Sequence, residues 1–540
     1  MKFESHKTDI VIVGAGVGGM AAALAALRRG HSVTMTEEYR WIGGQLTVQA
    51  TPPDEHPWIE EIGGTLSYRE FRDGVRQYYR ENYRLTERAL SDSHFNPGNA
   101  TVSKLACEPR VSEAVLRRMI EPWIASGQLR LLTSVRVVNC QSHGDAVGDL
   151  EFESIRTGDR FTVSAGYVID ATELGEVIAI AGVEHVTGTE SQSETGEPHA
   201  PAVADPTNMQ AFSWPFALDY DAEGDHTIDR PTGYQELRRF RPEFWPGDYL
   251  SFIYPDPRTL ETIVADFEPH SDGPDELLVA DQSLDPGSKN LWVYRRIMWR
   301  HHFVPGTQPT DITLVNWPMT DYIGGPLFGQ SEAEAAMHRE GARELSLSYL
   351  YWLQTEAPRP DGGTGWKGLR LRPDVMGTDD GLSMGPYIRE SRRIRALRTV
   401  VEQDISLAVR GDHGAVRYDD SVGIGAYRID LHPSTGGDNY IDIACSPYQI
   451  PLSALIPVRV TNLIPAAKNI GTTHITNGCY RVHPSEWNIG EAAGALAAFC
   501  IARRTTPHAV AQTAALTRDL QADLVRGGVE LAWPETVRGY

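Results

Sequence analysis

The sequence contains little cysteine. Five cysteines occur among 540 residues, and no two of them form a C-x-x-C pair. This pattern argues against a zinc ribbon, a dithiol redox centre and a disulfide framework. The adjacent histidines His301 and His302 cannot chelate one ion from a regular strand or helix, and no acidic cluster lies beside them in the sequence. We therefore expect no metal site.

Long apolar runs are also missing. No stretch reaches the roughly 18 apolar residues that a membrane span needs, so we expect no such span. The first residues, MKFESHKTD, lack the apolar centre of a signal peptide. Together with the scarce cysteine, this predicts a reduced cytoplasmic protein.

Positive charge is in deficit. The chain carries 50 Lys and Arg against 72 Asp and Glu, a formal net charge of −22, and no basic block stands out. Nucleic acid and anionic membrane surfaces are therefore poor partners on electrostatic grounds. Otherwise the composition, 41% apolar and 23% charged, is typical of a globular protein long enough for two or three domains. A small-molecule substrate is the partner that remains, and the oligomeric state is not indicated.

One stretch near the start of the chain, residues 8–37, has the pattern of a dinucleotide-binding unit. The apolar, β-branched run Ile10 to Val13 predicts a buried parallel strand. An Ala- and Leu-rich helix is expected over Met20 to Arg29 and a second strand over Ser32 to Thr36. The G-x-G-x-x-G glycines stand between the first strand and the helix, and an acid follows the second strand.

Each conspicuous residue of this stretch has a physical task. Gly14 allows the tight turn, Gly16 lets the backbone approach a pyrophosphate, and Gly19 lets the helix pack closely on the strand. The helix N-terminus offers unpaired N–H groups to the phosphates. Glu37 is placed to accept a hydrogen bond from a ribose hydroxyl. With all parts in register, the motif is a strong signal for dinucleotide binding.

Several later segments complete an α/β pattern. Strand patterning runs over Leu129 to Cys140 and over Leu150 to Ala165, around a turn at residues 157–160, and a further strand is expected over Tyr167 to Asp170, followed by ATELGE. Residues 50–64 read as an irregular surface excursion. An Ala-rich helix is expected to open at Gly490 and to run to Arg503.

Taken together, five motifs are similar to those of the bacterial FAD-dependent oxidoreductases, which share the glutathione-reductase-type FAD fold. The motifs are GAGVGG, Glu37 with the following IGGQ, ATELGE, PYIRESRRI (386–394) and HITNGCYRVHPSEWNIGEAAG (474–494). The resemblance implies FAD as the cofactor, with the helix at Gly490 placing its N-terminus beside the flavin ring. The implied cofactor residues are Gly14, Gly16, Gly18, Gly19, Glu37, Glu38, Gly43, Gly44, Gln45, Ala171, Thr172, Gly175, Asn488, Gly490, Ala493 and Gly494.

The predicted fold class is α/β, with a doubly wound, Rossmann-like FAD-binding domain. Residues 1–206 form its first part and residues 416–540 its second part with the C-terminal helices. Residues 207–415 are predicted to be an inserted, mixed α+β substrate domain, because Pro and Trp are dense there and helical periodicity is poor.

Candidates for chemistry follow the last predicted strand, Leu463 to Ala466, in a predicted loop that faces the flavin. His474 or His483 is expected to act as general acid or base, since histidine titrates near neutral pH. Arg481 is expected to bind a substrate carboxylate or carbonyl, or to stabilise flavin charge. Tyr480 is a further catalytic candidate. Alternatively, these side chains only satisfy polar groups of the loop.

Three functions stay open at this stage. The first is an FAD-dependent dehydrogenase or oxidase of a small organic substrate. Five tryptophans between Gln210 and Gly329 hint that this substrate is aromatic or cyclic. The second is an FAD-dependent monooxygenase, although the segment AAKNIG lacks the Gly-Asp expected there and the W-x-W-x-I-P signature of halogenases is missing. The third is a non-enzymatic dinucleotide-binding protein.

Overall fold

The computed structural model describes residues 4–271 and 290–537, and its largest sheet has seven strands. Parallel pairs join β1 to β2, β2 to β3, β1 to β6, and β6 to β21, while β4, β5 and β6 pair antiparallel. It is thus a mixed α/β sheet. The order is β3 (Leu129–Thr133), β2 (Val33–Glu37), β1 (His6–Val13), β6 (Arg160–Asp170), β5 (Ala146–Ser154) and β4 (Val135–His143), with β21 (Leu463–Pro465) beside the end of β6.

One predicted strand is divided in the structure. The expected strand Leu129 to Cys140 splits at Ser134 into β3 and β4, because Ser134 has a φ of 59° and cannot continue an extended chain. β3 then pairs with β2, whereas β4 turns away to pair with β5. The backbone turn thus separates the parallel part of the sheet from its antiparallel part.

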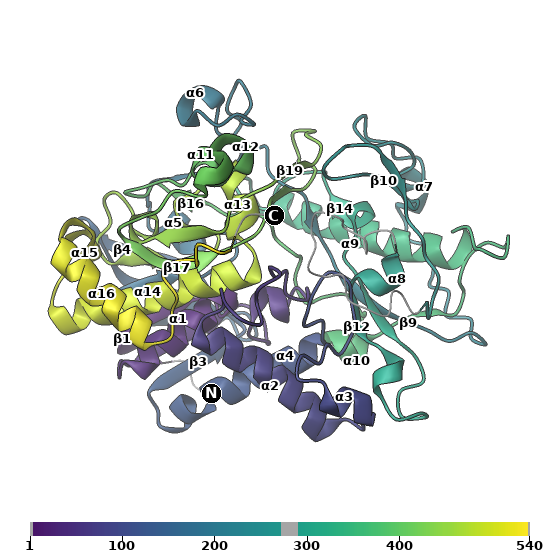
Figure 1. Cartoon of the computed structure of the whole chain (residues 1–540), viewed down its shortest axis with the longest axis horizontal. Coiled ribbons are helices and arrows are strands. Elements are labelled where there is room, and N and C mark those ends of the chain that lie inside the picture. The colour runs from purple at the N-terminus through teal and green to yellow at the C-terminus, as the bar shows by residue number, and fades with distance from the viewer. Residues whose placement is uncertain (1–3, 272–289, 538–540) are drawn as a thin grey trace.

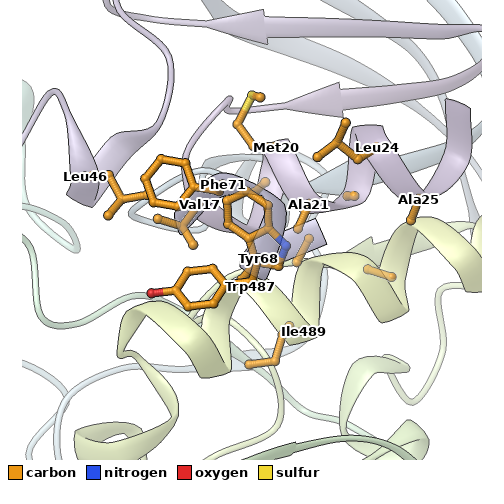
Figure 2. Packing of buried hydrophobic residues seen from close by; sticks show 14 of the residues in the cluster. Val17, Met20, Ala21, Leu24, Ala25, Leu46, Tyr68, Phe71, Trp487 and Ile489 are labelled. Carbon is orange, nitrogen blue, oxygen red and sulfur yellow. The ribbon is translucent and has the colours of Figure 1, made fainter. Parts of the chain in front are cut away.

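Two long helices from opposite ends of the chain pack along each other. They are α1 (Val17–Arg28) and α14 (His483–Arg503), and Figure 1 shows the purple start and the yellow end of the chain in one lobe. In Figure 2, Trp487 on α14 lies beside Tyr68 and Phe71, next to Val17 of α1. Small residues on the facing sides of the two helices allow this close approach.

The start of α14 corrects two predictions. The helix begins at His483, with Pro484 in its first turn, so the expectation that a helix opens at Gly490 is wrong. The predicted loop 474–486 is also wrong, since α13 covers His474–Tyr480 and Arg481 follows as its C-cap. The Thr473 side chain caps α13, and Val482 separates the two helices with an extended backbone.

Other helices cover the same lobe. Among them, α2 packs on α4. The remaining bounds in the first and last parts of the chain are α2 Leu66–Asn82, α3 Glu87–Ser91, α4 Pro109–Ala125, α5 Glu176–Ile180, α6 Gln192–Thr195, α11 Glu402–Ile405, α12 Leu407–Arg410, α15 Pro507–Gln512 and α16 Ala514–Arg526, with strands β7 His185–Val186, β16 Arg393–Ile394, β17 Ser421–Gly425, β18 Ile429–Leu431, β19 Ile441–Ile443 and β20 Tyr448–Pro451.

The middle of the chain forms a second lobe, teal in Figure 1. It contains a four-stranded sheet, in the order β12 (Arg296–Met298), β13 (Ile312–Val315), β9 (Phe216–Tyr220) and β15 (Leu369–Leu371), and the long helix α9 (Glu332–Thr355). Its short elements are β8 Phe212–Ser213, α7 Tyr234–Leu237, β10 Ile253–Pro255, β11 Thr262–Val264, α8 Leu291–Tyr294, β14 Asp321–Tyr322 and α10 Pro373–Met376.

This lobe has an apolar cluster of its own. The cluster is drawn from residues between Phe212 and Leu382, together with Tyr440. Trp214, Trp245, Trp292 and Trp317 belong to it, so these tryptophans are packing residues. The proposed domain bounds stay a prediction. No helix within residues 4–271 and 290–537 is long and apolar enough to cross a membrane.

Candidate active site

A cavity of about 550 Å³ lies at the carboxyl ends of β1, β2 and β6. This volume falls in the usual range of small-molecule and cofactor sites. Parallel strands of an open α/β sheet commonly present a ligand site at this edge. Seven predicted cofactor residues line the cavity, namely Gly14, Gly16, Glu37, Glu38, Gly44, Ala171 and Thr172.

Sequence reasoning missed the opposite wall of the cavity. That wall comes from Val48 and Gln49, from β4, from residues 327–339 around the start of α9 and from the segment that contains the PYIRESRRI motif. The motif itself was the available signal, but nothing in its spacing says which face it presents. The wall includes Val48, Gln49, Val135, Arg136, Phe328, Arg339, Gly385, Pro386, Ile388 and Arg392.

The N-terminus of α1 is open toward this cavity. Its N-cap, Gly16, makes no side-chain capping hydrogen bond. Gly44 faces Gly16 closely, because a Cβ on Gly44 would lie 2.8 Å from the Gly16 Cα. Two glycines and the free N–H groups of a helix N-terminus form a surface that accepts a phosphate backbone. The residues therefore fit the diphosphate of a dinucleotide.

Glu37 stabilises the glycine loop. Its carboxylate accepts hydrogen bonds from the N–H groups of Ala15, at 2.8 Å, and Tyr39, at 3.0 Å. Burial raises the pKa of Glu37 to about 8, and the two backbone donors oppose that rise. Glu37 thus orders the glycine loop beside the cavity, and it is also predicted to contact the ribose there.

Several other predicted cofactor residues pack helices instead of lining the cavity. A Cβ on Gly490 would overlap the carbonyl of Gly18, and one on Gly494 would overlap that of Ala22. These glycines set the distance between α1 and α14. Their contact with a cofactor stays a prediction, as it does for the other predicted residues outside the cavity lining, which are Gly19, Gly43, Gln45, Gly175, Asn488 and Ala493.

A buried lysine lies between the cavity and α14. The Lys468 ammonium forms ion pairs with Glu173, which lines the cavity, and with Glu486, whose carboxylate is 3.6 Å away. Burial lowers the pKa of Lys468, but the two carboxylates outweigh it and raise the pKa above its ordinary value. Burial raises the pKa of Glu486 to about 7 despite that ammonium. Lys468 was missed because it follows no recognised motif.

The junction of α13 and α14 is bonded to Gln45, the residue that follows the cavity-lining Gly44. The Gln45 amide donates hydrogen bonds to the carbonyl of Arg481, at 3.1 Å, and to the carboxylate of Glu486, at 3.0 Å. The Arg481 guanidinium donates to the Tyr387 hydroxyl at 3.2 Å and to the Asp430 carboxylate at 3.1 Å. The loop that contains Gly43, Gly44 and Gln45 therefore lies next to the candidate catalytic residue Arg481.

His483 opens α14 and is fully buried. The N–H of Asp54 donates a 3.1 Å hydrogen bond to its Nδ1, and its Nε2 has no partner among the described residues. Burial lowers the pKa of His483 to about 4, so the ring is neutral at pH 7. Because Nδ1 accepts a hydrogen bond, the proton of the neutral ring lies on Nε2. His483 is therefore poised as a hydrogen-bond donor.

The other two candidates lie elsewhere. His474 Nδ1 pairs with the Glu390 carboxylate; burial opposes the charge, but the carboxylate prevails and raises the pKa of His474. Tyr480 donates through its hydroxyl to the carbonyl of Gln449 at 2.8 Å, and its ring stacks on Tyr448 with centroids 4.4 Å apart. The structure thus brings Arg481 and His483 together and places Tyr480 in the core.

The expected surface excursion is in part buried. Residues 51–56 are buried, so for them that prediction is wrong. Asp54 contacts Arg295, with a guanidinium nitrogen 3.5 Å from a carboxylate oxygen. Pro52 and Pro53 suggested a surface turn, yet their rigidity equally suits a fixed inner wall.

Metal ligation has no candidate cluster in the described part of the chain. No group of three or more His, Cys, Asp or Glu side chains there could hold an ion. Both rings of the pair His301–His302 pack on Trp299, with centroids 5.1 and 4.8 Å away, and the His302 ring also contacts the Phe95 ring at 4.9 Å.

Comparison with known proteins gives one broad match and several short ones. A family model described as FAD dependent oxidoreductase matches residues 9–524. The N,N-dimethylglycine/sarcosine dehydrogenase of Chromohalobacter salexigens is 51% identical over 50 residues, 9% of this chain and 7% of that protein. The L-amino-acid oxidase of Trimeresurus stejnegeri is 29% identical over 123 residues, 23% of each protein. The chain thus spans less than a quarter of these relatives' lengths.

Likeness to solved structures is weaker. L-proline dehydrogenase from P. horikoshii matches with 13% identity and a TM-score of 0.18, over 36% of this chain and 26% of that one. The rebeccamycin biosynthetic enzyme RebC, with reduced flavin, matches with 17% identity and a TM-score of 0.24, over 41% and 39%.

Proposed function

The chain belongs to the FAD-dependent oxidoreductase family, and from this premise we propose that it is a dehydrogenase or oxidase of a small organic substrate. It is an enzyme, and its cofactor is FAD. Bound FAD supplies the group that accepts or delivers a hydride. The protein's own task is to bind and orient both reactants, to exclude water and to hold protons at defined atoms.

One observation carries the proposal. Seven of the predicted cofactor residues line the cavity, and Gln45, which directly follows the lining residue Gly44, donates a hydrogen bond to the buried junction that contains Arg481 and His483. A cofactor site and a site with polar, water-excluded side chains are therefore adjacent. Hydride transfer needs this arrangement, because the hydride-donating and hydride-accepting atoms must meet away from solvent.

We assign the cofactor contacts to the cavity lining. The open N-terminus of α1 with Gly16 and Gly44 would hold the diphosphate, and Glu37 would hold the adenosine ribose. The Lys468 ammonium lies next to the same cavity, where it is paired with the lining residue Glu173. Gln45 orients the junction of α13 and α14 toward the cofactor.

We assign the substrate contacts to the junction. The Nε2–H of His483 donates a hydrogen bond to an oxygen of the substrate, and the Arg481 guanidinium fixes the surroundings through Tyr387 and Asp430. Such a donor stabilises charge that develops on a substrate oxygen during hydride transfer. His474, paired with Glu390, holds a proton on the ring beside a buried carboxylate. We therefore propose that His483 acts as a hydrogen-bond donor and not as the expected general base.

No structural observation favours a monooxygenase, although one short curated match is to an enzyme of that class. Where the sequence lacks the Gly-Asp pair, Lys468 stands in an ion-paired, buried position. We also propose a cytoplasmic location, from the scarce cysteine, and a partner set without nucleic acid or membrane, from the acidic composition.

The test is anaerobic reduction of the FAD-loaded enzyme, followed by its visible absorbance. The proposal predicts that a small organic substrate bleaches the flavin within seconds and that NADPH alone does not. Rapid bleaching by NADPH alone, followed by oxygen-dependent hydroxylation of an added substrate, would instead identify a monooxygenase.

A further inference from the structure

A rigid inner segment holds three polar side chains that come from distant parts of the chain. The segment is Thr51-Pro52-Pro53-Asp54, here called the TPPD segment, and all four of its residues are buried. Asp54 contacts His483 and Arg295, while Thr51 contacts Asn316. The two prolines fix the backbone between these anchors, so the three side chains are held in a defined arrangement.

Arg295 has few partners for a buried arginine. Its side chain is 10% exposed, and its one hydrogen bond within the described residues is the 3.5 Å contact to Asp54. Its Nε is buried and has no partner there, although a guanidinium offers five donors. The guanidinium also lies over the Tyr294 ring, 5.2 Å from the centroid. Donors left over on a buried guanidinium suit an anion, and a carboxylate above all.

Asn316 presents a free acceptor. Its amide nitrogen donates to the Thr51 hydroxyl at 3.2 Å, and its Oδ1 is buried with no partner in the described chain. The orientation of the amide follows from the network, because the Thr51 hydroxyl already donates to the carbonyl of Gln49 and must therefore accept from Asn316. The oxygen is thus left for a donor from outside.

His483 offers a free hydrogen-bond donor, where Asn316 offers a free acceptor. Its Nδ1 is occupied by the N–H of Asp54, which leaves Nε2–H as a free donor. A free donor on His483 and a free acceptor on Asn316, both tied to the TPPD segment, match a hydroxyl group, which accepts and donates at once. Buried groups of this kind cost free energy unless a ligand satisfies them.

We propose that Arg295, Asn316 and His483, held by the TPPD segment, form the substrate site for a small hydroxy acid. The carboxylate binds Arg295, and the hydroxyl lies between His483 and Asn316. This inference rests on the proposed function, since it names the substrate class of the same active site. Arg295 and Asn316 then determine specificity, and Arg481 positions the site from the other side through Tyr387.

The test is equilibrium binding to the holoenzyme, measured by calorimetry and by perturbation of the flavin spectrum under anaerobic conditions. Three probes separate the contacts: glycolate, propionate, in which a methyl group replaces the hydroxyl, and ethylene glycol, which has no carboxylate. We expect glycolate to bind about tenfold to a hundredfold more tightly than propionate, and ethylene glycol not to saturate the site.

Two variants assign the contacts to residues. Asn316→Ala is expected to remove the preference for glycolate over propionate while keeping propionate binding. Arg295→Met is expected to weaken both acids about tenfold to a hundredfold, and Arg295→Lys to restore part of the loss. The control is Arg410→Met, because Arg410 bonds to the Gly414 carbonyl near α12 and should leave all three affinities unchanged. Circular dichroism and flavin content show whether each variant is folded.

The outcomes separate this proposal from the function on which it rests. Equal affinity for the three probes, or unchanged acid binding in folded Arg295→Met, overturns the hydroxy-acid site. If the enzyme holds FAD and a neutral organic substrate still reduces it, the proposed function stands while the substrate class fails. If no organic substrate reduces the bound FAD but calorimetry shows selective glycolate binding, the site stands and the proposed function fails.

Discussion

The backbone N–H of Asp54 donates a 3.1 Å hydrogen bond to Nδ1 of His483, across 429 positions of sequence. This contact fixes the ring, places its proton on Nε2 and joins the TPPD segment to the start of α14. The segment meets Gln45 as well, since the Thr51 N–H donates to the Gln45 carbonyl at 2.8 Å. The candidate site is therefore one connected structure built from both ends of the chain.

The donor role of His483 predicts the pH behaviour of flavin reduction. The pKa of about 4 lies below its ordinary value, so the ring stays neutral from pH 5 to 9 and contributes no step to the rate in that range. His483→Leu should slow reduction about a hundredfold or more, and His483→Gln, which keeps an N–H donor, should retain more activity. Stopped-flow reduction between pH 5 and 9 measures both. A rate in the wild type that rises through pH 6 to 7 and is flat in His483→Gln would contradict the assignment.

Because α1 packs closely on α14, one methyl group added between the two helices should lower the stability of the protein. Gly490→Ala places a Cβ against the Gly18 carbonyl, so the helices must separate. Overpacking of this kind costs about 1–3 kcal/mol, and we expect a lower melting temperature together with weaker FAD retention. Thermal unfolding and flavin release measure the two effects. Gly166→Ala is the matched control, because its Cβ would find the nearest atom at an ordinary 3.4 Å. Equal melting temperatures for the two variants would refute this account of the helix pair.

The buried carboxyl of Glu486 predicts a loss of stability at higher pH. Burial raises its pKa to about 7, so the folded state binds more protons than the unfolded state between about pH 4.5 and 7. Stability from this group is therefore present at low pH, falls as pH rises through 7, and is level above. Glu486→Gln should remove this slope, which amounts to about 2–3 kcal/mol at most. Denaturant unfolding from pH 5 to 8.5 measures it, with the exposed Glu121→Gln as control. Parallel curves for wild type and Glu486→Gln would show that Glu486 does not cause the slope.

The position of Glu37 predicts its effect on cofactor binding. Glu37→Ala removes the side-chain carboxylate that accepts from two backbone N–H groups and orders the glycine loop, together with the proposed ribose contact, so FAD affinity should fall about tenfold to a hundredfold. Fluorescence titration of the stripped protein with FAD measures the affinity, and Glu121→Ala should bind as the wild type does. Unchanged affinity in Glu37→Ala would place the ribose elsewhere.

The sequence pattern predicted those residues of the site whose positions follow from the spacing of a strand, a turn and a helix. Gly14, Gly16, Glu37 and the residues after β6 line the cavity because strand, turn and helix lengths determine where they point. The beginning of α14 was misplaced because Ala-rich helices read alike wherever they begin, and the true signal, Val482 followed by Pro484, lies outside the Ala-rich run.

The substrate side could not be predicted, for a different physical reason. Arg295, Asn316 and Asp54 are brought together by tertiary packing between the two lobes, and no sequence spacing relates them. Residues 51–56 read as an exposed turn because Pro, Asp, Glu and His favour surfaces on average. Their burial becomes intelligible only when their partners, Arg295 and His483, are in place.

The central claim concerns where FAD lies relative to His483, and a crystal structure of the FAD-loaded enzyme tests it most directly. We predict density for the adenosine end beside Glu37, the diphosphate at Gly16 and Gly44, and the flavin ring at the Gln45 side of the cavity, next to the junction that contains His483. Density with the ring at the opposite end of the cavity, toward Arg339, or with no flavin near the glycine loop, would contradict the account.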